Sequence, residues 1–323
     1  MIQILVSLVL FLCVSCITND EDIFTRSDLL RALYIPQYKR LLETKIERSW
    51  VERDVVFENV SFNGRHDERI NAIVSYSLLA KFQPGPALIL MSGSTNKKED
   101  FYNNLNFLRD WADKGFFIIS IDRPTLFKLN TPEPEDILRT WGRPVYDLTR
   151  TVDFIISRAE ADSEKIGMLG ISLGSMEALW LAALDDRIDA VVAVSGHLVW
   201  PDVFQSGSWR RIFSRFTFFK QHISRGTSNL NAMNSFFNEY SDITVVDASN
   251  VIRMWKPIPL FIIAGENDPY NSESSARSLC RAAKNAYGDF AYYIDFKIYD
   301  GAGHNFVHKM EEDALKWLER KLF

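Results

Sequence analysis

A serine near the middle of the chain lies in a pattern that suits nucleophilic chemistry. Gly170-Ile171-Ser172-Leu173-Gly174 matches G-x-S-x-G, in which small residues let a serine occupy a tight strand-to-helix turn with its hydroxyl exposed. The apolar residues 166–169 predict a strand before this turn, and residues 176–184 predict a helix after it. We therefore interpret Ser172 as a nucleophile. The alternative is a glycine-rich turn that contains a serine by chance, which the strand–turn–helix setting disfavours.

A serine nucleophile needs a histidine to remove its proton, and that histidine needs an acid to orient it. His304 suits the role of the base because Gly301-Ala302-Gly303-His304-Asn305 places it in a loop directly after the last predicted strand. His308 falls at the start of the last predicted helix and is expected on the surface. The other histidines are His66 in a hairpin turn, His197 directly after a strand, and His222 in a basic, aromatic segment.

The acid is expected in Gly265-Glu266-Asn267-Asp268-Pro269, which follows the predicted strand 259–264. Asp268 is favoured over Glu266 because it lies farther out on the loop. Asp300 is a further rival, but it directly precedes the glycines of the histidine loop and suits a turn. Ser172, Asp268 and His304 would then each follow a buried strand, at the sheet edge where α/β proteins place their ligands.

Acyl transfer also needs backbone N–H groups that stabilise the negative charge of the tetrahedral intermediate. Leu173, directly after the nucleophile, is predicted to supply one of them. The second is expected in Ser92-Gly93-Ser94-Thr95, after the predicted strand 87–91, and we select Ser94. A plain surface loop is the alternative, because short Gly/Ser turns are common between a strand and a helix.

The elements that must position these residues alternate between strand and helix. Residues 55–62 and 70–79 predict an antiparallel pair around Asn63-Gly64, at one edge of a sheet. Apolar runs predict buried strands at 87–91, 116–121, 165–170, 190–195, 259–264 and 292–299. Helices are predicted at 101–113, 146–159, 176–184 and 311–322. This alternation predicts an α/β fold with a mostly parallel central sheet and helices on both faces.

The spacing of the candidate residues predicts an insertion. Ser172 and Asp268 are 96 residues apart, roughly 45 more than the intervening elements need. We assign the excess to a cap over the active site, roughly 197–250. Residues 209–220 within it mix aromatic and basic side chains, which would shape an acyl or aryl pocket or contact a membrane. The alternative that we favour is a helix packing its Phe residues onto the core. His197 would line the pocket or be a hydrogen-bonded structural residue.

From about Val55 to the C-terminus these motifs resemble the α/β-hydrolase superfamily, nearest to its dienelactone hydrolase-like, acetyl xylan esterase-like and acyl-CoA thioesterase-like branches. The matching motifs are GISLGS for the nucleophile, GENDP for the acid and GAGHNF for the histidine, while WGRP with VYDL (141–148) resembles the lead into the second helix. The resemblance implies an α/β-hydrolase fold with Ser172, Asp268 and His304 in the usual chain order. Two segments depart from the family pattern: Ser92-Gly93 replaces His-Gly, and Asp122-Arg123-Pro124 replaces a glycine-rich loop. The substrate preference of these branches is therefore not expected to apply to this chain.

The function that we expect is a carboxylic-ester hydrolase that acts on a small-molecule or acyl substrate through an acyl-serine intermediate, with no metal or organic cofactor. A peptidase or a thioesterase is an alternative, because the triad does not select the leaving group. A non-catalytic binding or surface protein on a hydrolase scaffold is an alternative of another class. Loss of a triad residue would mark it, and the sequence retains all three.

Composition limits the partners. The 323 residues are 47% hydrophobic and 24% charged, with a net charge of −5. This suits a compact α/β domain, assigned to residues 49–323. The negative charge argues against nucleic acid as a partner, because phosphate binding needs a surplus of Lys and Arg.

The first residues suggest export. Residues 4–14 are an apolar run, shorter than the roughly 20 residues that span a bilayer but typical of a secretory signal. We expect a signal segment at 1–16 and an exported rather than cytoplasmic protein; a buried N-terminal strand or helix is the alternative. Residues 12–16 also resemble a loose lipoprotein signal, in which Cys16 would carry a lipid, and export without a lipid remains equally open.

Between the signal and the domain, residues 17–48 are predicted to form a helical extension. Its apolar spacing indicates an amphipathic helix over 27–46, interrupted near Pro36. Cys280 is the single cysteine beyond the signal segment, so an exported chain would contain no internal disulfide.

Overall fold

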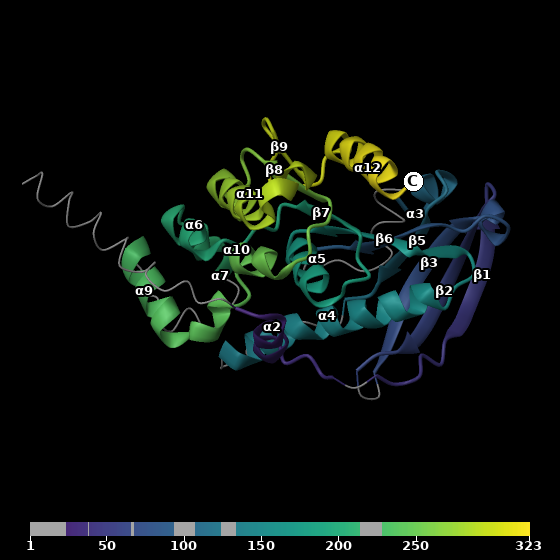
Figure 1. Cartoon of the computed structure of the whole chain (residues 1–323), viewed down its shortest axis with the longest axis horizontal. Coiled ribbons are helices and arrows are strands. Elements are labelled where there is room, and N and C mark those ends of the chain that lie inside the picture. Colours follow the sequence, from purple (N-terminus) through teal and green to yellow (C-terminus); the bar gives the residue numbers. More distant parts are fainter. Residues whose placement is uncertain (1–23, 38, 66–67, 94–106, 124–133, 214–227) are drawn as a thin grey trace, which may run out of the picture.

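The structure is a computed structural model, and it describes the chain except for residues 1–23, 38, 66–67, 94–106, 124–133 and 214–227 (Figure 1). The predicted signal segment with Cys16, the predicted oxyanion residue Ser94, and both His66 and His222 lie outside the described residues. Of the helices that are described, none combines the length and the hydrophobicity needed to cross a membrane.

The centre of the molecule is a nine-stranded sheet in the order β1-β2-β3-β5-β4-β6-β7-β8-β9. Its strands are β1 Lys45–Glu52, β2 Val55–Asn63, β3 Arg69–Ser77, β4 Gly85–Met91, β5 Phe117–Ile121, β6 Ala161–Ile171, β7 Ala190–Val194, β8 Leu260–Gly265 and β9 Ile294–Tyr299. Strands β4 to β9 pair in parallel. Strands β1, β2 and β3 pair antiparallel and join the sheet at β5. The predicted mostly parallel sheet with an antiparallel edge is confirmed.

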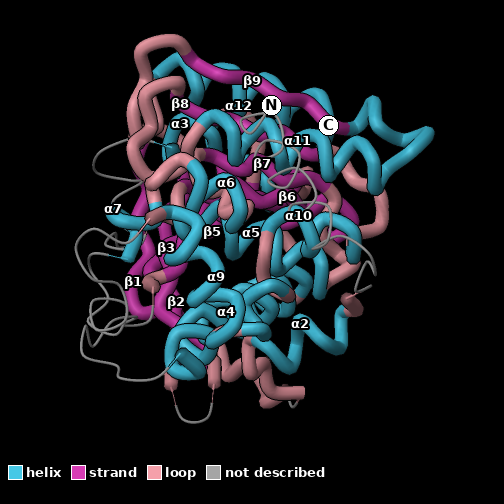
Figure 2. Tube along the Cα trace, turned by 90° about the vertical axis from the view of Figure 1, so that its left-hand side faces the viewer, coloured by secondary structure: helices cyan, strands magenta, loops and turns pink. Residues whose placement is uncertain are grey.

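Helices cover both faces of this sheet (Figures 1 and 2). The α-helices are α2 Arg26–Ala32, α3 Phe107–Asp113, α4 Pro134–Ile156, α5 Leu173–Leu184, α6 Trp200–Gln205, α7 Trp209–Phe213, α9 Asn229–Glu239, α10 Ala248–Val251, α11 Glu273–Tyr287 and α12 His308–Leu322. Short 3-10 turns are η1 Leu78–Lys81, η3 Ser241–Thr244, η4 Ile252–Met254 and η5 Gly288–Tyr293. Helices α3 and α12 pack into the core on one face, and α2, α4, α5 and α11 into the core on the other.

Strand β4 shows why both faces must be covered. Its side chains alternate between the two cores, with Ala87, Ile89 and Met91 in the larger one and Leu88 and Leu90 in the one under α3 and α12. Successive residues of a strand point to opposite faces, so a continuous apolar run is buried only between two helical layers.

The N-terminal region differs from the prediction. The expected helix over 27–46 is wrong in its second part, because α2 ends at Ala32 and residues 45–52 form β1, which pairs antiparallel with β2. A helix cannot continue readily through Pro36. As an edge strand, β1 is largely exposed, so it lacks the apolar run by which the buried strands were predicted.

Two helices also differ from the prediction. Helix α4 begins at Pro134, so Trp141-Gly142-Arg143-Pro144 lies within the helix rather than before it. Gly142 allows α4 to pack on the end of α2, because an added Cβ would lie 1.7 Å from the Leu33 carbonyl oxygen. Helix α11 was not predicted, and its many Ser, Arg and Lys residues leave only a narrow apolar stripe.

The segment between β7 and β8 is a helical insertion that contains α6, α7, α9 and α10 (Figure 1). Its interior is aromatic: the ring centroids of Phe204 and Phe236 lie 5.0 Å apart, and those of Phe204 and Trp209 lie 5.8 Å apart. Trp200 also stacks on Trp141 of α4, with centroids 6.3 Å apart. The expectation that the aromatic residues of 209–220 pack onto the core therefore holds for Trp209 and Phe213, which are buried. Residues 214–220 lie outside the described part, and the cap role stays a prediction.

Candidate active site

Ser172 occupies a strained turn between β6 and α5. Its backbone has φ 57° and ψ −121°, a left-handed conformation that costs a non-glycine residue free energy and often marks a functional site. The glycines of the motif are sterically required, because a Cβ on Gly170 would lie 2.0 Å from the Gly174 carbonyl oxygen. The Ser172 N–H donates to the carbonyl of Val194 on β7 at 2.8 Å. The turn is thus fixed to the sheet beside the end of β6.

The structure brings the three predicted residues together. His304 Nε2 lies 2.9 Å from Ser172 Oγ, and His304 Nδ1 lies 2.8 Å from Asp268 Oδ2. Ser172 follows β6, Asp268 follows β8 and His304 follows β9. The carboxyl ends of these three strands share one edge of the parallel sheet. One continuous chain of hydrogen bonds therefore joins the hydroxyl, the imidazole and the carboxylate.

The Asp268 carboxylate is held on both oxygens. Its side chain is 0% exposed, and Oδ1 accepts the backbone N–H groups of Tyr270 at 2.8 Å and Asn271 at 3.0 Å. Asn271 in turn donates its side-chain amide to the Ser195 carbonyl at 2.7 Å. The Tyr270 ring packs on the His304 ring, with centroids 4.9 Å apart. The loop after β8 therefore orients both the acid and the imidazole.

The rival acids have other contacts. Glu266 accepts the N–H of Gly301 at 2.8 Å, so it fixes the start of the histidine loop. Asp300 is exposed. His308 begins α12 with its side chain 80% exposed and faces Glu311 and Glu312, which confirms the expected surface position.

His197 is a structural residue rather than a pocket residue. It is 0% exposed, and its Nε2 lies 3.0 Å from the carbonyl oxygen of Ala193. Burial lowers the pKa of His197 to about 4, although the bond to Ala193 and the nearby Asp268 carboxylate oppose this change. The imidazole is therefore neutral at neutral pH and stays buried in that form.

The predicted oxyanion residues are only partly described. Leu173 is the first residue of α5, so its N–H lies at the positive end of the helix dipole. Ser94 is not described, but Gly93 is, and a Cβ added to it would lie 3.4 Å from Ser172 Cβ and 3.8 Å from Ser172 Oγ. Gly174 packs against β4, because its added Cβ would lie 2.2 Å from the Met91 carbonyl oxygen. The end of β4 therefore adjoins the nucleophile.

Sequence interpretation missed Asn271 and a buried ion pair between Arg123 and Glu177, whose side chains are 4% and 0% exposed. A signal for the pair is present in the sequence. Glu177 is the single charged residue of Leu173–Leu184, an otherwise apolar helix, and a buried carboxylate in such a helix needs a cationic partner. Arg123 is the first cation after β5.

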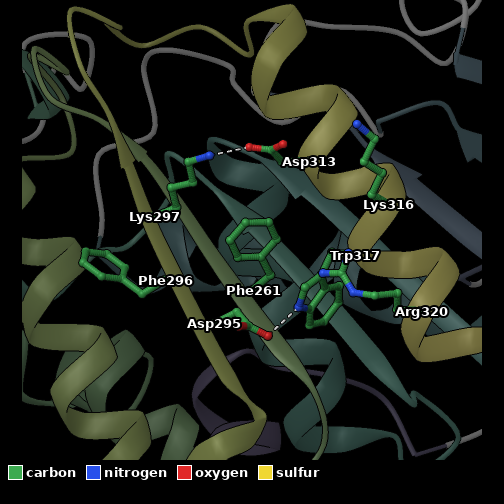
Figure 3. Close-up of a pocket in the computed structure, with 8 residues that line it drawn as sticks. All are labelled: Phe261, Asp295, Phe296, Lys297, Asp313, Lys316, Trp317 and Arg320. Carbon is green, nitrogen blue, oxygen red and sulfur yellow. Dashed lines mark hydrogen bonds and ion pairs between the residues drawn. The ribbon is translucent and has the colours of Figure 1, made fainter.

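The structure also contains a pocket whose lining comes from β8, β9 and α12 and includes none of the candidate catalytic residues (Figure 3). It is lined by Phe261, Asp295, Phe296, Lys297, Asp313, Lys316, Trp317 and Arg320. Lys297 pairs with Asp313, and Trp317 Nε1 donates to Asp295 at 2.6 Å. Within the described ranges, no group of three His, Cys, Asp or Glu side chains could bind a metal.

Solved structures of similar fold include esterases. An acetyl xylan esterase from Paenibacillus sp. R4 matches with a TM-score of 0.66 and 18% identity, over 94% of this chain and 96% of that one. A glucuronoyl esterase from Solibacter usitatus matches with a TM-score of 0.68 and 11% identity, over 92% of each chain. At this identity the likeness shows the fold, which is that of the α/β-hydrolases.

Sequence comparison adds a relative and a family. The relative is "Putative hydrolase YtaP" of Bacillus subtilis (strain 168), 42% identical over 101 residues, which are 29% of this chain and 34% of the relative. The match thus spans about a third of the length of that curated relative. Residues 134–322 match the model of the prolyl oligopeptidase family, and this range includes Ser172, Asp268 and His304. The chain therefore belongs to the prolyl oligopeptidase family, with an α/β-hydrolase fold.

Proposed function

We propose that this protein is a serine hydrolase that cleaves a carboxylic ester through an acyl-serine intermediate. The observation that carries the proposal is the hydrogen-bonded chain from Ser172 through His304 to Asp268. Nucleophile, base and orienting acid are each within hydrogen-bond reach of the next, which is the geometry that nucleophilic catalysis needs.

In the first half of the proposed reaction, Ser172 Oγ attacks the ester carbonyl carbon while its proton moves to His304 Nε2. Asp268 accepts a hydrogen bond from Nδ1–H and stabilises the imidazolium. The Leu173 N–H stabilises the oxyanion together with an N–H from the loop after β4. Collapse of the tetrahedral intermediate transfers the Nε2 proton to the leaving alcohol and leaves the acyl group on Ser172.

In the second half, His304 Nε2 removes a proton from a water molecule, and the resulting hydroxide attacks the acyl carbon. Collapse of this second tetrahedral intermediate breaks the bond to Ser172 Oγ, which takes back the proton from Nε2. The products are a carboxylic acid and the free enzyme. His304 thus acts twice as base and twice as acid, and the residues that we assign to the steps need no metal or organic cofactor.

The esterase proposal is supported by structures of similar fold, which include the acetyl xylan esterase and the glucuronoyl esterase described above. An S-formylglutathione hydrolase from Agrobacterium tumefaciens, with 15% identity and a TM-score of 0.60, also shares the fold. The second candidate is a peptidase, which the family match over residues 134–322 favours. Both reactions would use the same three residues, and they differ in the leaving group.

A fluorophosphonate probe tests the nucleophile. We expect it to label the folded protein, and we expect Ser172→Ala to abolish labelling while Ser274→Ala, which changes an exposed serine of α11, leaves it intact. An unlabelled but folded wild-type protein would favour the non-catalytic alternative and overturn the proposal.

Measurements of kcat distinguish His304, the proposed base, from another histidine of the chain. We expect His304→Ala to reduce kcat for p-nitrophenyl acetate by about 10⁴-fold or more, and His308→Ala, four residues away and exposed, to retain wild-type kcat. A panel of matched acyl esters, thioesters and peptide amides then ranks kcat/KM by leaving group. Preference for the amides would replace the esterase by the peptidase.

We further propose that residues 1–16 direct export and that Cys16, or the insertion, attaches the protein to a membrane. The support is the apolar run over 4–14 and the Leu-Cys-Val-Ser-Cys segment at 12–16. Fractionation and the intact mass of the mature chain test this: a mature chain that begins at Cys16 with added lipid mass supports the anchor. An unprocessed chain in the cytoplasm would contradict export.

A further inference from the structure

A buried ion pair joins the loop after β5 to α5, the helix that begins directly after the candidate nucleophile. Arg123 follows β5 and Glu177 lies five residues after Ser172 on α5. Arg123 Nη1 pairs with the Glu177 carboxylate, and the two side chains are 4% and 0% exposed. Two charges removed from water need strong mutual contacts, and such a pair often adds little stability over an apolar pair of similar size. Its presence beside the site therefore suggests a role other than stability.

The rest of the guanidinium is bound to the loop after β4. Arg123 Nη2 donates to the Ser92 carbonyl and Nε donates to the Gly93 carbonyl, the latter at 3.2 Å. Three donor atoms are thus engaged with protein groups, and the side chain is nearly inaccessible. Arg123 is consequently unsuited to bind a substrate itself.

These contacts determine how the loop presents its peptide groups. In a planar trans peptide the N–H points opposite to the C=O. Because Arg123 binds the Ser92 carbonyl, the N–H of that peptide, which belongs to Gly93, points away from Arg123. Gly93 is the residue of this loop that adjoins the nucleophile, because a Cβ added to Gly93 would lie 3.4 Å from Ser172 Cβ.

We propose that Arg123, held by Glu177, is a positioning residue that orients the Ser92–Gly93 backbone beside Ser172, so that an N–H of this loop binds the oxyanion. The proposal rests on the proposed serine-hydrolase function. Glu177 lies on the helix that begins at the nucleophile, so the pair also fixes the distance between the two sources of oxyanion donors. If the Ser92–Gly93 backbone loses this orientation, stabilisation of the transition state decreases more than binding of the substrate in the ground state does.

The test removes both charges together, because a single substitution would leave one buried charge unpaired. In the full-length enzyme, Arg123→Met/Glu177→Leu is expected to keep Tm near the wild-type value, to reduce kcat for p-nitrophenyl acetate by about 10- to 100-fold, and to change KM by less than about 3-fold. The control is Arg158→Met/Glu58→Gln/Glu160→Gln, because Arg158 pairs with both glutamates; the three side chains are 12%, 7% and 19% exposed. The glutamine at position 58 keeps an acceptor for the Tyr76 hydroxyl, which donates to Glu58. This control is expected to keep wild-type kcat.

Arg123→Lys separates positioning from charge pairing. Lysine keeps the ion pair but lacks the planar fork that reaches two carbonyls, so we expect a wild-type Tm with a reduced kcat. Wild-type kcat in either folded variant would overturn the proposal, and so would loss of the folded state in both, which would assign the pair a structural role. If the wild-type protein itself shows neither turnover nor fluorophosphonate labelling, the proposed function fails instead.

Discussion

His304 and Asp268 meet through a hydrogen bond of 2.8 Å between Nδ1 and Oδ2, and the carboxylate in this bond cannot rotate freely. Its second oxygen accepts two backbone N–H groups, from Tyr270 and Asn271. The carboxylate in turn directs Nε2 toward Ser172 Oγ, 2.9 Å away. The orientation of the proposed base therefore depends on the loop after β8 as much as on the loop that carries His304.

Replacement of Asp268 by asparagine tests this dependence. Asp268→Asn keeps the size of the side chain, but an amide does not hold the tautomer in which Nε2 accepts the serine proton. We expect kcat for p-nitrophenyl acetate to fall by about 10⁴-fold, with fluorophosphonate labelling slowed in parallel. Asp300→Asn, which changes an exposed residue of the next loop, serves as control. A kcat within about 10-fold of wild type would show that Asp268 is not the orienting acid.

The sequence predicted the parts of the fold that are buried on both faces. β4 and β7 are continuous apolar runs because helices cover both of their faces, and the turns after β6, β8 and β9 contain the candidate residues. Edge strand β1 escaped prediction because one of its sides is unpaired and its residues are largely polar and exposed. Helix α11 was not predicted because only a narrow stripe of its surface is apolar.

Residues of the candidate site could be predicted from the sequence where each lies in a loop directly after one strand. Asp268 and His304 each follow a strand in a short motif, so position along the chain was sufficient. The Arg123–Glu177 pair depends on two elements 54 residues apart, and only the fold brings them together. Asn271 orients Asp268 through its backbone N–H, a property that residue type does not reveal.

Two glycines beside the site should respond differently to the same substitution. A Cβ on Gly196 would lie 1.9 Å from the Ser172 carbonyl oxygen, whereas the nearest atom to a Cβ on Gly303 is 3.7 Å away. We expect Gly196→Ala to displace the nucleophile turn, lowering Tm and abolishing labelling by the fluorophosphonate probe. Gly303→Ala should change the free energy of unfolding by less than about 1 kcal/mol. Thermal melts together with probe labelling check both, and normal labelling of Gly196→Ala would contradict the close packing.

Trp200 should anchor the helical insertion to the domain. Its side chain is 1% exposed, its indole N–H donates to the Ile243 carbonyl at 3.2 Å, and its ring stacks on Trp141 of α4. We expect Trp200→Ala to reduce the free energy of unfolding by about 3–5 kcal/mol. Phe82→Ala, which removes an aromatic ring that is 89% exposed, should change it by less than about 0.5 kcal/mol. Urea unfolding measures both, and equal effects would argue against this anchoring.

His197 should make the stability of the fold depend on pH. Burial lowers the pKa of His197 to about 4, while in the unfolded chain it is about 6.5. Between these values the unfolded chain binds the extra proton, so stability is complete above pH 6.5 and is lost as the pH falls toward 4. Buried carboxyls oppose this trend, since burial raises the pKa of Asp247 to about 6 and that of Asp147 to about 7. A comparison of variants is therefore needed to isolate the histidine.

The comparison uses His197→Gln, which keeps an N–H donor for the Ala193 carbonyl and cannot titrate. Urea unfolding at pH 7 and pH 4.5 gives the change in the free energy of unfolding for each protein. We expect wild type to lose about 2 kcal/mol more than His197→Gln over this interval, because only wild type must keep a buried imidazole unprotonated. His308→Gln, which removes an imidazole that is 80% exposed, should retain the wild-type dependence. If wild type and His197→Gln lose the same amount, protonation of His197 does not oppose folding, and its ring must have access to water or to a charged partner in the folded protein.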